Sequence, residues 1–244
     1  MAGSVIGRGG CQVKEMRSEF QTSINIPDSN GTERLVKIFV LLYENTDPEN
    51  PNFIDAAERI AGVVQRIAEY LQEAEVRFAG GDLKALQSSL GLTEGPSVDA
   101  RILVNESIAG YLKSSDGEGG SKLDNIQQET KIEQVKIFEM LCPRSTDFVV
   151  RLFGKPHQIF ETAKKIIIDT YHIYQRLQNN QVYESQYDPK NVDERTAEKY
   201  GGYTVTSGAT ADLRELGKTV NEKNKNMLLA YWKSKSNITD VRVC

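Results

Sequence analysis

The stretch AGSVIGRGGC, residues 2–11, decides the fold of the first part of the chain. Small and apolar residues lead into the turn GRGG at residues 7–10, and apolar residues then recur at helical spacing from Val13 to Phe20. This pattern predicts two helices joined by a glycine turn. Because glycine has no Cβ, the turn can bend sharply and let a phosphate approach the amides at the positive end of the second helix. Arg8 adds a cation at the same place.

The residues that follow distinguish this turn from an ordinary tight turn between two packed helices. Residues 21–27 alternate as a strand, residues 28–32 are typical of a turn, and residues 34–40 alternate as a second strand. After a polar insertion, an apolar stripe predicts a long helix over residues 54–78. Helix, glycine loop, helix, strand, strand, helix is the order of a KH domain, whose glycine loop clamps about four nucleotides of a single strand.

The segments AGSVIGRGG, INIPDS and ERLVKI resemble the first KH domain of the heterogeneous nuclear ribonucleoprotein K and poly(C)-binding protein family. A second copy of the pattern begins at Val98, and its CPRSTDFVVRLFGKP and later YDPKNVDERTAEKYGGYT resemble the second KH domain of that family and the segment after it. The resemblance covers about residues 2–205, without a counterpart of the family's third KH domain. In the second copy we expect strands at 101–104, 133–139 and 148–153, and helices at 121–130 and 156–177.

The resemblance implies an α+β protein with two type I KH domains, each a three-stranded antiparallel sheet packed on three helices. We expect the first domain at residues 1–78, a linker at 79–97, the second domain at 98–178 and a mostly disordered tail at 179–244. The family pattern has an opening strand before Ala2, and here only Met1 precedes it. Either the chain is cut at this point, which we favour, or another segment takes that position in the sheet. A cut predicts a first domain less stable than an intact one.

Composition limits the kind of nucleic-acid contact that is expected. The 244 residues carry a formal net charge of −4, whereas domains that coat nucleic acid by general attraction are usually basic. Three cysteines, Cys11, Cys142 and Cys244, lie far apart and show no metal-ligand spacing, which favours a reduced nuclear and cytoplasmic location. We expect no metal or cofactor, and no apolar run is long enough for a membrane span.

Site residues are assigned from the resemblance. The turn at residues 7–10 presents backbone to phosphate, basic side chains supply charge, apolar residues form a floor for the bases, and Asn25 and Arg34 lie at its edges. Val5, Ile24 and Ile26 could instead belong to the core. Arg34 could instead be a solvated strand residue rather than a reader of bases. Across both copies the assigned residues are Gly3, Ser4, Val5, Ile6, Gly7, Arg8, Gly9, Gly10, Lys14, Arg17, Ile24, Asn25, Ile26, Arg34, Gly110, Gly117, Gly119, Gly120, Lys122 and Lys136.

The two glycine loops differ in charge. Residues 2–20 hold three basic and two acidic side chains, and residues 106–130 hold two basic and five acidic ones. Glu118 stands where the first copy has Arg8, with Asp116 beside it, and carboxylates next to a phosphate are repulsive. Phe148 stands where the first copy has Arg34, and a phenylalanine offers no donors to a base edge. We therefore expect the first domain to carry RNA recognition and the second to bind weakly or to contact proteins.

Two other functions were weighed against RNA binding. An enzyme is disfavoured because neither G-x-x-x-x-G-K-[ST] nor G-x-G-x-x-G occurs, and His157 and His172 have no convincing catalytic partners. A protein-interaction scaffold or an interfering isoform is the stronger alternative, since the absent strand and the acidic second loop both favour it. The expected partners are single-stranded RNA, possible single-stranded DNA, and proteins bound through the second domain or the tail.

Overall fold

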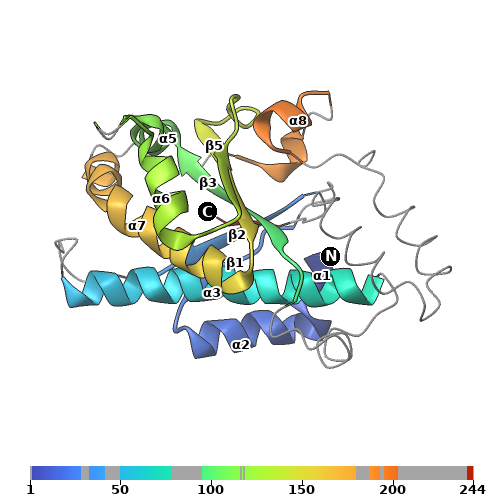
Figure 1. Ribbon diagram of the computed structural model, residues 1–244. Helices are drawn as coiled ribbons and strands as arrows, with labels where there is room; N and C mark the ends of the chain where they lie inside the picture. Colours follow the sequence, from blue (N-terminus) through green and yellow to red (C-terminus); the bar gives the residue numbers. More distant parts are fainter. Residues whose placement is uncertain are drawn as a thin grey trace, which may run out of the picture.

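The computed structural model describes residues 2–28, 33–41, 50–78, 95–115, 117, 119–179, 187–192, 195–202 and 241–243, and these form an α+β structure (Figure 1). In chain order the elements are α1 (Ala2–Ile6), the 3-10 turn η1 (Arg8–Gly10), α2 (Cys11–Glu19), β1 (Ser23–Asn25), β2 (Arg34–Phe39), α3 (Pro51–Phe78), β3 (Val98–Asn105), α5 (Glu106–Lys113), α6 (Lys122–Thr130), β4 (Gln134–Ile137), β5 (Asp147–Gly154), α7 (Pro156–Asn179), the 3-10 turn η2 (Pro189–Asn191), α8 (Ala197–Tyr200) and β6 (Val241–Val243).

The elements fall into two units with the same succession of secondary structure. In the first unit, α1 and α2 precede β1, β2 and α3, and in the second unit α5 and α6 precede β4, β5 and α7. The second unit also has an opening strand, β3, ahead of its helices. The helices and strands predicted from sequence are confirmed in kind within the described residues. The first strand is shorter than predicted, and the expected linker lies mostly outside the described residues.

One six-stranded sheet runs through both units in the order β1-β2-β6-β3-β5-β4. The pairs β1–β2, β3–β5 and β4–β5 are antiparallel, whereas β6 is parallel to both β2 and β3. Arg34 pairs with Val241 on one side of β6, and Arg101 pairs with Arg242 on the other. The edge of β2 next to which the sequence has no opening strand is therefore paired with β6, whose residues come from the far end of the chain.

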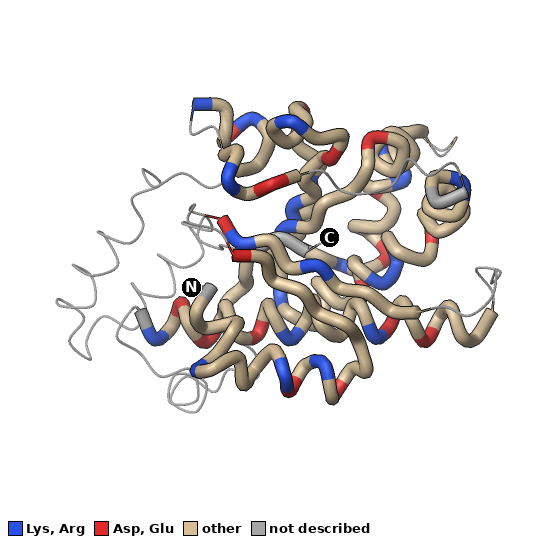
Figure 2. The backbone as a smooth tube through the Cα atoms, turned by 180° about the vertical axis from the view of Figure 1, so that it is seen from behind, with Lys and Arg blue, Asp and Glu red and all other residues tan. Residues whose placement is uncertain are grey.

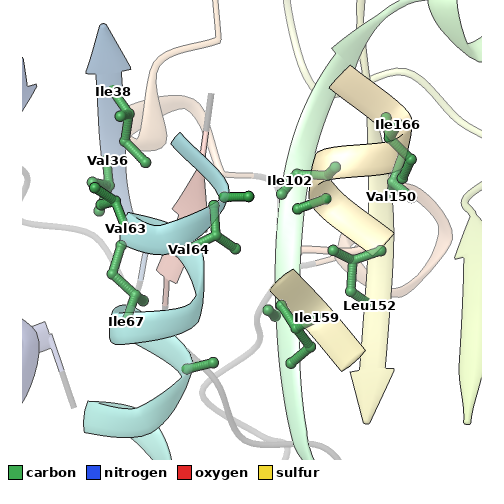
Figure 3. Packing of buried hydrophobic residues seen from close by; sticks show 14 of the residues in the cluster. Val36, Ile38, Val63, Val64, Ile67, Ile102, Val150, Leu152, Ile159 and Ile166 are labelled. Carbon is green, nitrogen blue, oxygen red and sulfur yellow. The ribbon is translucent and has the colours of Figure 1, made fainter. Parts of the chain in front are cut away.

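Both long helices pack on one face of this sheet (Figure 3). Val36 and Ile38 of β2 lie against Val63, Val64 and Ile67 of α3, as the apolar stripe predicts. Ile102, Val150 and Leu152 of the second unit lie in the same way against Ile159 and Ile166 of α7. The helices also touch each other, since the rings of Phe53 and Tyr171 stack with centroids 3.8 Å apart. The two units thus share one continuous core.

The opposite face of the sheet is covered by residues 187–192 and 195–202. Leu35, Leu103 and Val149 alternate with the helix-facing residues and form a second apolar cluster with Tyr187 and Tyr200. Figure 1 shows α8 on the side of the sheet away from α3. Tyr187 donates a hydrogen bond to the buried Glu33 of the first unit. Arg101 of the second unit donates to the carbonyl of Gly201 at 2.6 Å.

This covering segment is an ordered part of the tail that the sequence predicts to be mostly disordered. Few branched apolar residues follow residue 179, but two tyrosines are enough here because each fills a position over the sheet: Tyr187 is 3% exposed and Tyr200 is 0% exposed. The remainder of the expected tail lies outside the described residues, apart from β6. No helix in the described part of the chain is long and apolar enough to cross a membrane.

Candidate nucleic-acid interface

The loop between α1 and α2 is held in a conformation that requires glycine. Gly7 has φ 75° and ψ 168°, a region that residues with a Cβ essentially avoid. A Cβ at Gly7 would also lie 2.8 Å from Sγ of Cys11, so neither the backbone nor the space admits a side chain. Gly10 has φ 75° and ψ 20° and stands in open space. The glycines therefore fix a sharp reversal that brings α2 back alongside α1.

Hydrogen bonds within the turn use the amides of Gly10 and Cys11, the latter donating to the carbonyl of Arg8, while no side chain caps the start of α2. The amide of Gly7 donates to the carbonyl of Gly3 at 2.9 Å, and that of Gly10 donates to Gly7 at 3.1 Å. The N-cap of α2 is Gly10, which has no side chain to accept from the first-turn amides, and the first turn carries no acidic residue. The positive end of the helix dipole is thus uncompensated and lies next to the exposed Arg8. This arrangement suits a phosphate.

Two arginines connect the far side of α2 with the strands. Arg17 donates through Nε to the carbonyl of Ile24 at 3.0 Å and through its terminal nitrogen to the same oxygen. Arg34, at the start of β2, donates to the carbonyl of Pro27 at 3.4 Å. Both guanidinium groups are held beside the end of β1 and have further donors available, since each carries five N–H groups. We call these two side chains the arginine wall.

The other residues assigned to the first loop divide between surface and core. Gly3, Gly9, Lys14 and Asn25 are exposed, and Ser4, Ile6 and Ile26 are half-buried. Val5 is 1% exposed and Ile24 is 3% exposed, so both side chains belong to the core and cannot touch a base. For these two residues the structure favours the core alternative, because both side chains belong to the hydrophobic cluster that also contains Val64 and Ile67 of α3. They support the groove from beneath.

Lysine and arginine do not form a continuous basic face in the described residues. Figure 2 shows basic and acidic positions interspersed along α2 and α3. Glu19 of α2, for example, pairs with Arg66 of α3 at 2.6 Å. The positive charge available to a ligand is therefore local to the glycine loop, as the acidic composition predicts.

Residues 1–39 match the sequence model of the KH domain. The match covers α1, the glycine loop, α2, β1 and β2, which is the part of the chain that forms the loop and the arginine wall. KH domains are single-stranded nucleic-acid-binding modules rather than enzymes, and the glycine loop is the part that holds the backbone of the strand. The geometry of the loop and the comparison thus agree on single-stranded nucleic acid as the ligand class of this domain.

The second glycine loop, between α5 and α6, is closed where the loop of the KH domain is open. Ser121 is the N-cap of α6 and accepts from the amide of Asp124 at 3.2 Å, while the Asp124 carboxylate accepts from the amide of Ser121 at 2.8 Å. The hydrogen bond from the Ser121 hydroxyl lowers the pKa of Asp124. This capping box uses first-turn donors and places a negative charge on the helix end. Both properties disfavour a phosphate.

The cations near the second loop are directed at aromatic rings. Nζ of Lys122 lies 3.7 Å from the centroid of the Tyr111 ring, and Nζ of Lys113 lies 4.7 Å from that of Phe148. Of the other residues assigned in this copy, Gly110, Gly117, Gly119 and Lys136 are exposed and Gly120 is half-buried. Asp116 and Glu118, on which the charge comparison of the two loops depends, lie outside the described residues.

A cavity of about 260 Å³ lies on the α3 side of the KH glycine loop. Four assigned residues line it, namely Gly3, Ser4, Gly7 and Arg8, whereas Lys14, Arg17, Ile24, Asn25, Ile26 and Arg34 do not. The residues assigned from the sequence do not include the rest of the lining, which is formed by Cys11, Gln12, Tyr70, Glu73, Ala74 and Arg77. The spacing of Tyr70, Ala74 and Arg77 places them on one stripe of α3, and that spacing is the signal that could have identified them.

Proposed function

We propose that this protein binds C-rich single-stranded RNA, and single-stranded DNA of like sequence, through the glycine loop of its KH domain, and that it acts in post-transcriptional regulation in the nucleus and cytoplasm. The observation that carries the proposal is the uncapped start of α2 beside Arg8, at the glycine turn between α1 and α2. A phosphate there receives hydrogen bonds from backbone and a full positive charge from one side chain.

The preference for cytosine is supported by the arginine wall. Arg17 and Arg34 each present a rigid fork of donors next to the end of β1, and the carbonyl oxygens of Ile24 and Pro27 fix where those forks lie. The Watson–Crick edge of cytosine carries two adjacent acceptors, which a guanidinium can satisfy together. Uracil carries a donor, N3–H, between its two acceptors, and adenine and guanine each have one acceptor on this edge, so none of them offers the guanidinium two adjacent acceptors.

Residues 98–178 form, in our proposal, a second KH domain with little affinity for nucleic acid, and residues 1–78 form the first. The closed start of α6 and the two lysines engaged with aromatic rings support this division. The second domain then serves to complete the shared sheet and core and to contact proteins.

The test is a fluorescence anisotropy titration of the full chain with cytosine-rich, uracil-rich and adenine-rich RNA of equal length at several salt concentrations. The cytosine-rich strand is expected to bind most tightly, with affinity falling as salt rises. Arg8→Asp should lower that affinity by roughly tenfold or more and reduce the salt slope by about one. Lys113→Asp, the matched change at the second loop, should have little effect.

Two outcomes would contradict the proposal. Equal affinity of Arg8→Asp and the parent protein would show that the glycine loop does not hold the phosphate. An absence of binding to all three strands by the folded parent would favour the alternative of a protein-interaction scaffold.

A further inference from the structure

The cavity beside the glycine loop lies apart from the arginine wall. Its lining comes from α1, the glycine loop, the start of α2 and the last turns of α3, and includes no residue of β1 or β2. The cavity therefore lies on the side of the glycine loop that faces α3. Gly7 and Arg8 of this loop line it, so a strand held at the loop can continue into the cavity.

The hollow exists because small residues meet where two helices face each other. Gly3, Ser4 and Gly7 line it from the α1 side, and Ala74 lines it from α3. A Cβ built at Gly3 meets nothing within 4 Å, so the space in front of this residue is open. Larger side chains at these positions would fill the cavity, as they do where α3 faces the sheet.

The polar groups of the cavity are those that a nucleotide requires. Arg8 and Arg77 are both exposed, and neither forms an ion pair with another described residue. Tyr70 is half-buried, and burial together with the nearby negative charge of Glu15 raises its pKa, so the ring remains a neutral phenol at pH 7. Oε1 of Gln12 is buried without a hydrogen-bond donor among the described residues. Glu73 is the one acidic lining residue.

Chemically this set combines two cations, an aromatic face and an unpaired acceptor. Guanidinium groups attract a phosphate, an aromatic face accepts a stacked base, and a buried carbonyl without a donor is satisfied by an amino group. The volume, about 260 Å³, lies just below the range of small-molecule sites, about 300–1,000 Å³, and so suits one nucleotide rather than a longer segment.

We propose that this cavity is an additional subsite of the KH domain, which takes the nucleotide next to those bound along the arginine wall. The phosphate of this nucleotide lies between Arg8 and Arg77, its base packs on Tyr70, and its amino group donates to Gln12. The subsite rests on the proposed function, because its occupant is part of the same bound strand. The subsite makes the affinity depend on the length of the strand, because a strand long enough to pass the glycine loop gains a contact that a tetranucleotide lacks.

The experiment compares two lengths of single strand, C4 and C7, titrated by fluorescence anisotropy against the full chain. Arg77→Ala should weaken C7 by roughly fivefold to tenfold, as expected for the loss of one charge-assisted contact, and leave C4 unchanged. Arg176→Ala is the matched control, since Arg176 is the basic residue in the last turn of α7 as Arg77 is in α3. It should change neither affinity. Ala74→Leu, which fills the cavity without changing charge, should reproduce the loss for C7 alone.

The outcomes separate this subsite from the proposed function. If Arg8→Asp weakens both lengths while Arg77→Ala and Ala74→Leu weaken neither, the glycine loop binds the strand and the subsite is wrong. If Arg77→Ala weakens C4 as much as C7, the arginine acts by general attraction and the subsite is again wrong. If the parent protein binds neither strand, the proposed function fails and the subsite fails with it.

Discussion

The starts of α2 and α6 occupy the same place in two similar units, yet one is open and the other is closed. Gly10 caps α2 without a side chain, whereas Ser121 and Asp124 cap α6 with a reciprocal pair of hydrogen bonds. A capping box stabilises a helix by accepting hydrogen bonds from first-turn amides, and these amides can then no longer donate to an anion. The comparison teaches that helix stability and phosphate binding compete for the same amides, and that the two units resolve the competition in opposite ways.

A second difference is how the two units complete their share of the sheet. The opening strand β3 belongs to the second unit and pairs along its length with β5. In the first unit the corresponding edge of β2 is paired by β6, in parallel and over Arg34–Val36 alone. The unit with the open helix is thus the one that depends on a distant part of the chain, and it shares its core and its covering segment with the second unit.

The largest effect is expected from the residue that holds the open loop in shape. Gly7→Ala introduces a Cβ at φ 75°, ψ 168° and 2.8 Å from Sγ of Cys11. We expect a loss of about 2–3 kcal/mol in the free energy of unfolding and loss of binding to C-rich RNA. Urea denaturation followed by circular dichroism measures the first, and the anisotropy titration measures the second.

Gly110→Ala is the matched control in the second unit. Gly110 lies in α5 with nothing within 4 Å of a built Cβ, so alanine there should be neutral or stabilising by about 0.5–1 kcal/mol. A Gly7→Ala protein as stable as the parent would show that the loop adopts another conformation in solution.

The next effect lies at the junction of the two units. Burial, with the negative charge of Asp99 adding to it, raises the pKa of Glu75 on α3 to about 8. The native state therefore keeps a proton that the unfolded chain releases at lower pH, and stability falls as pH rises from about 5 to about 8. Glu75→Gln should remove much of this decline and stabilise the protein at pH 8 by roughly 1–3 kcal/mol, a range that discounts the full shift because the side chain is half-buried.

The measurement is thermal unfolding of the parent and Glu75→Gln proteins between pH 5 and pH 9. Glu73→Gln removes a carboxylate from the exposed side of the same turn and is the control. Asp99 itself forms ion pairs with Arg101 and Arg151, at 3.4 Å and 2.8 Å. Parallel pH curves for all three proteins would contradict a proton held at this junction.

The elements were predictable from sequence where one short-range pattern determines them. The glycine turn, the stripe of α3 and the alternation of β2 are each local, and the structure has all three. The pairing of β6 was not predictable, because a three-residue strand far along the chain carries no signal for its partner. The same holds for Tyr187 and Tyr200, whose burial depends on a face of the sheet formed by both units.

The residues of the candidate site divide in the same way, into those that a local motif indicates and those that only tertiary packing brings together. The resemblance to a known motif assigned Gly7, Arg8 and Arg34 to the site, which stays a prediction. It also assigned Val5 and Ile24, which are 1% and 3% exposed, because core and groove residues lie on the same short elements. Tyr70 and Arg77 were missed because they come from a helix that the motif does not include, and only the packing of α1 on α3 brings them to the glycine loop.

The smallest effect, and the most direct test of the comparison between α2 and α6, comes from opening the closed helix. Ser121→Gly with Asp124→Ala gives α6 the same kind of start as α2. Glycine in place of a serine N-cap costs only a few tenths of a kcal/mol, roughly, so the fold should persist. In an Arg8→Asp background, where the first loop is silent, we expect binding of C-rich RNA to rise about twofold to fivefold.

A stronger gain should follow when Glu118→Lys is added, because a cation then stands where the first copy has Arg8. If the variant with the opened α6 is folded and stable but its affinity for C-rich RNA does not rise, the second unit fails to bind for a reason other than its capped helix. The ring contacts of Lys113 and Lys122 would then be the next cause to test, since both cations are held over aromatic rings. Replacing Phe148 by Arg, the residue at the matching position of the first unit, would release Lys113 and supply the missing base-reading donor in one step.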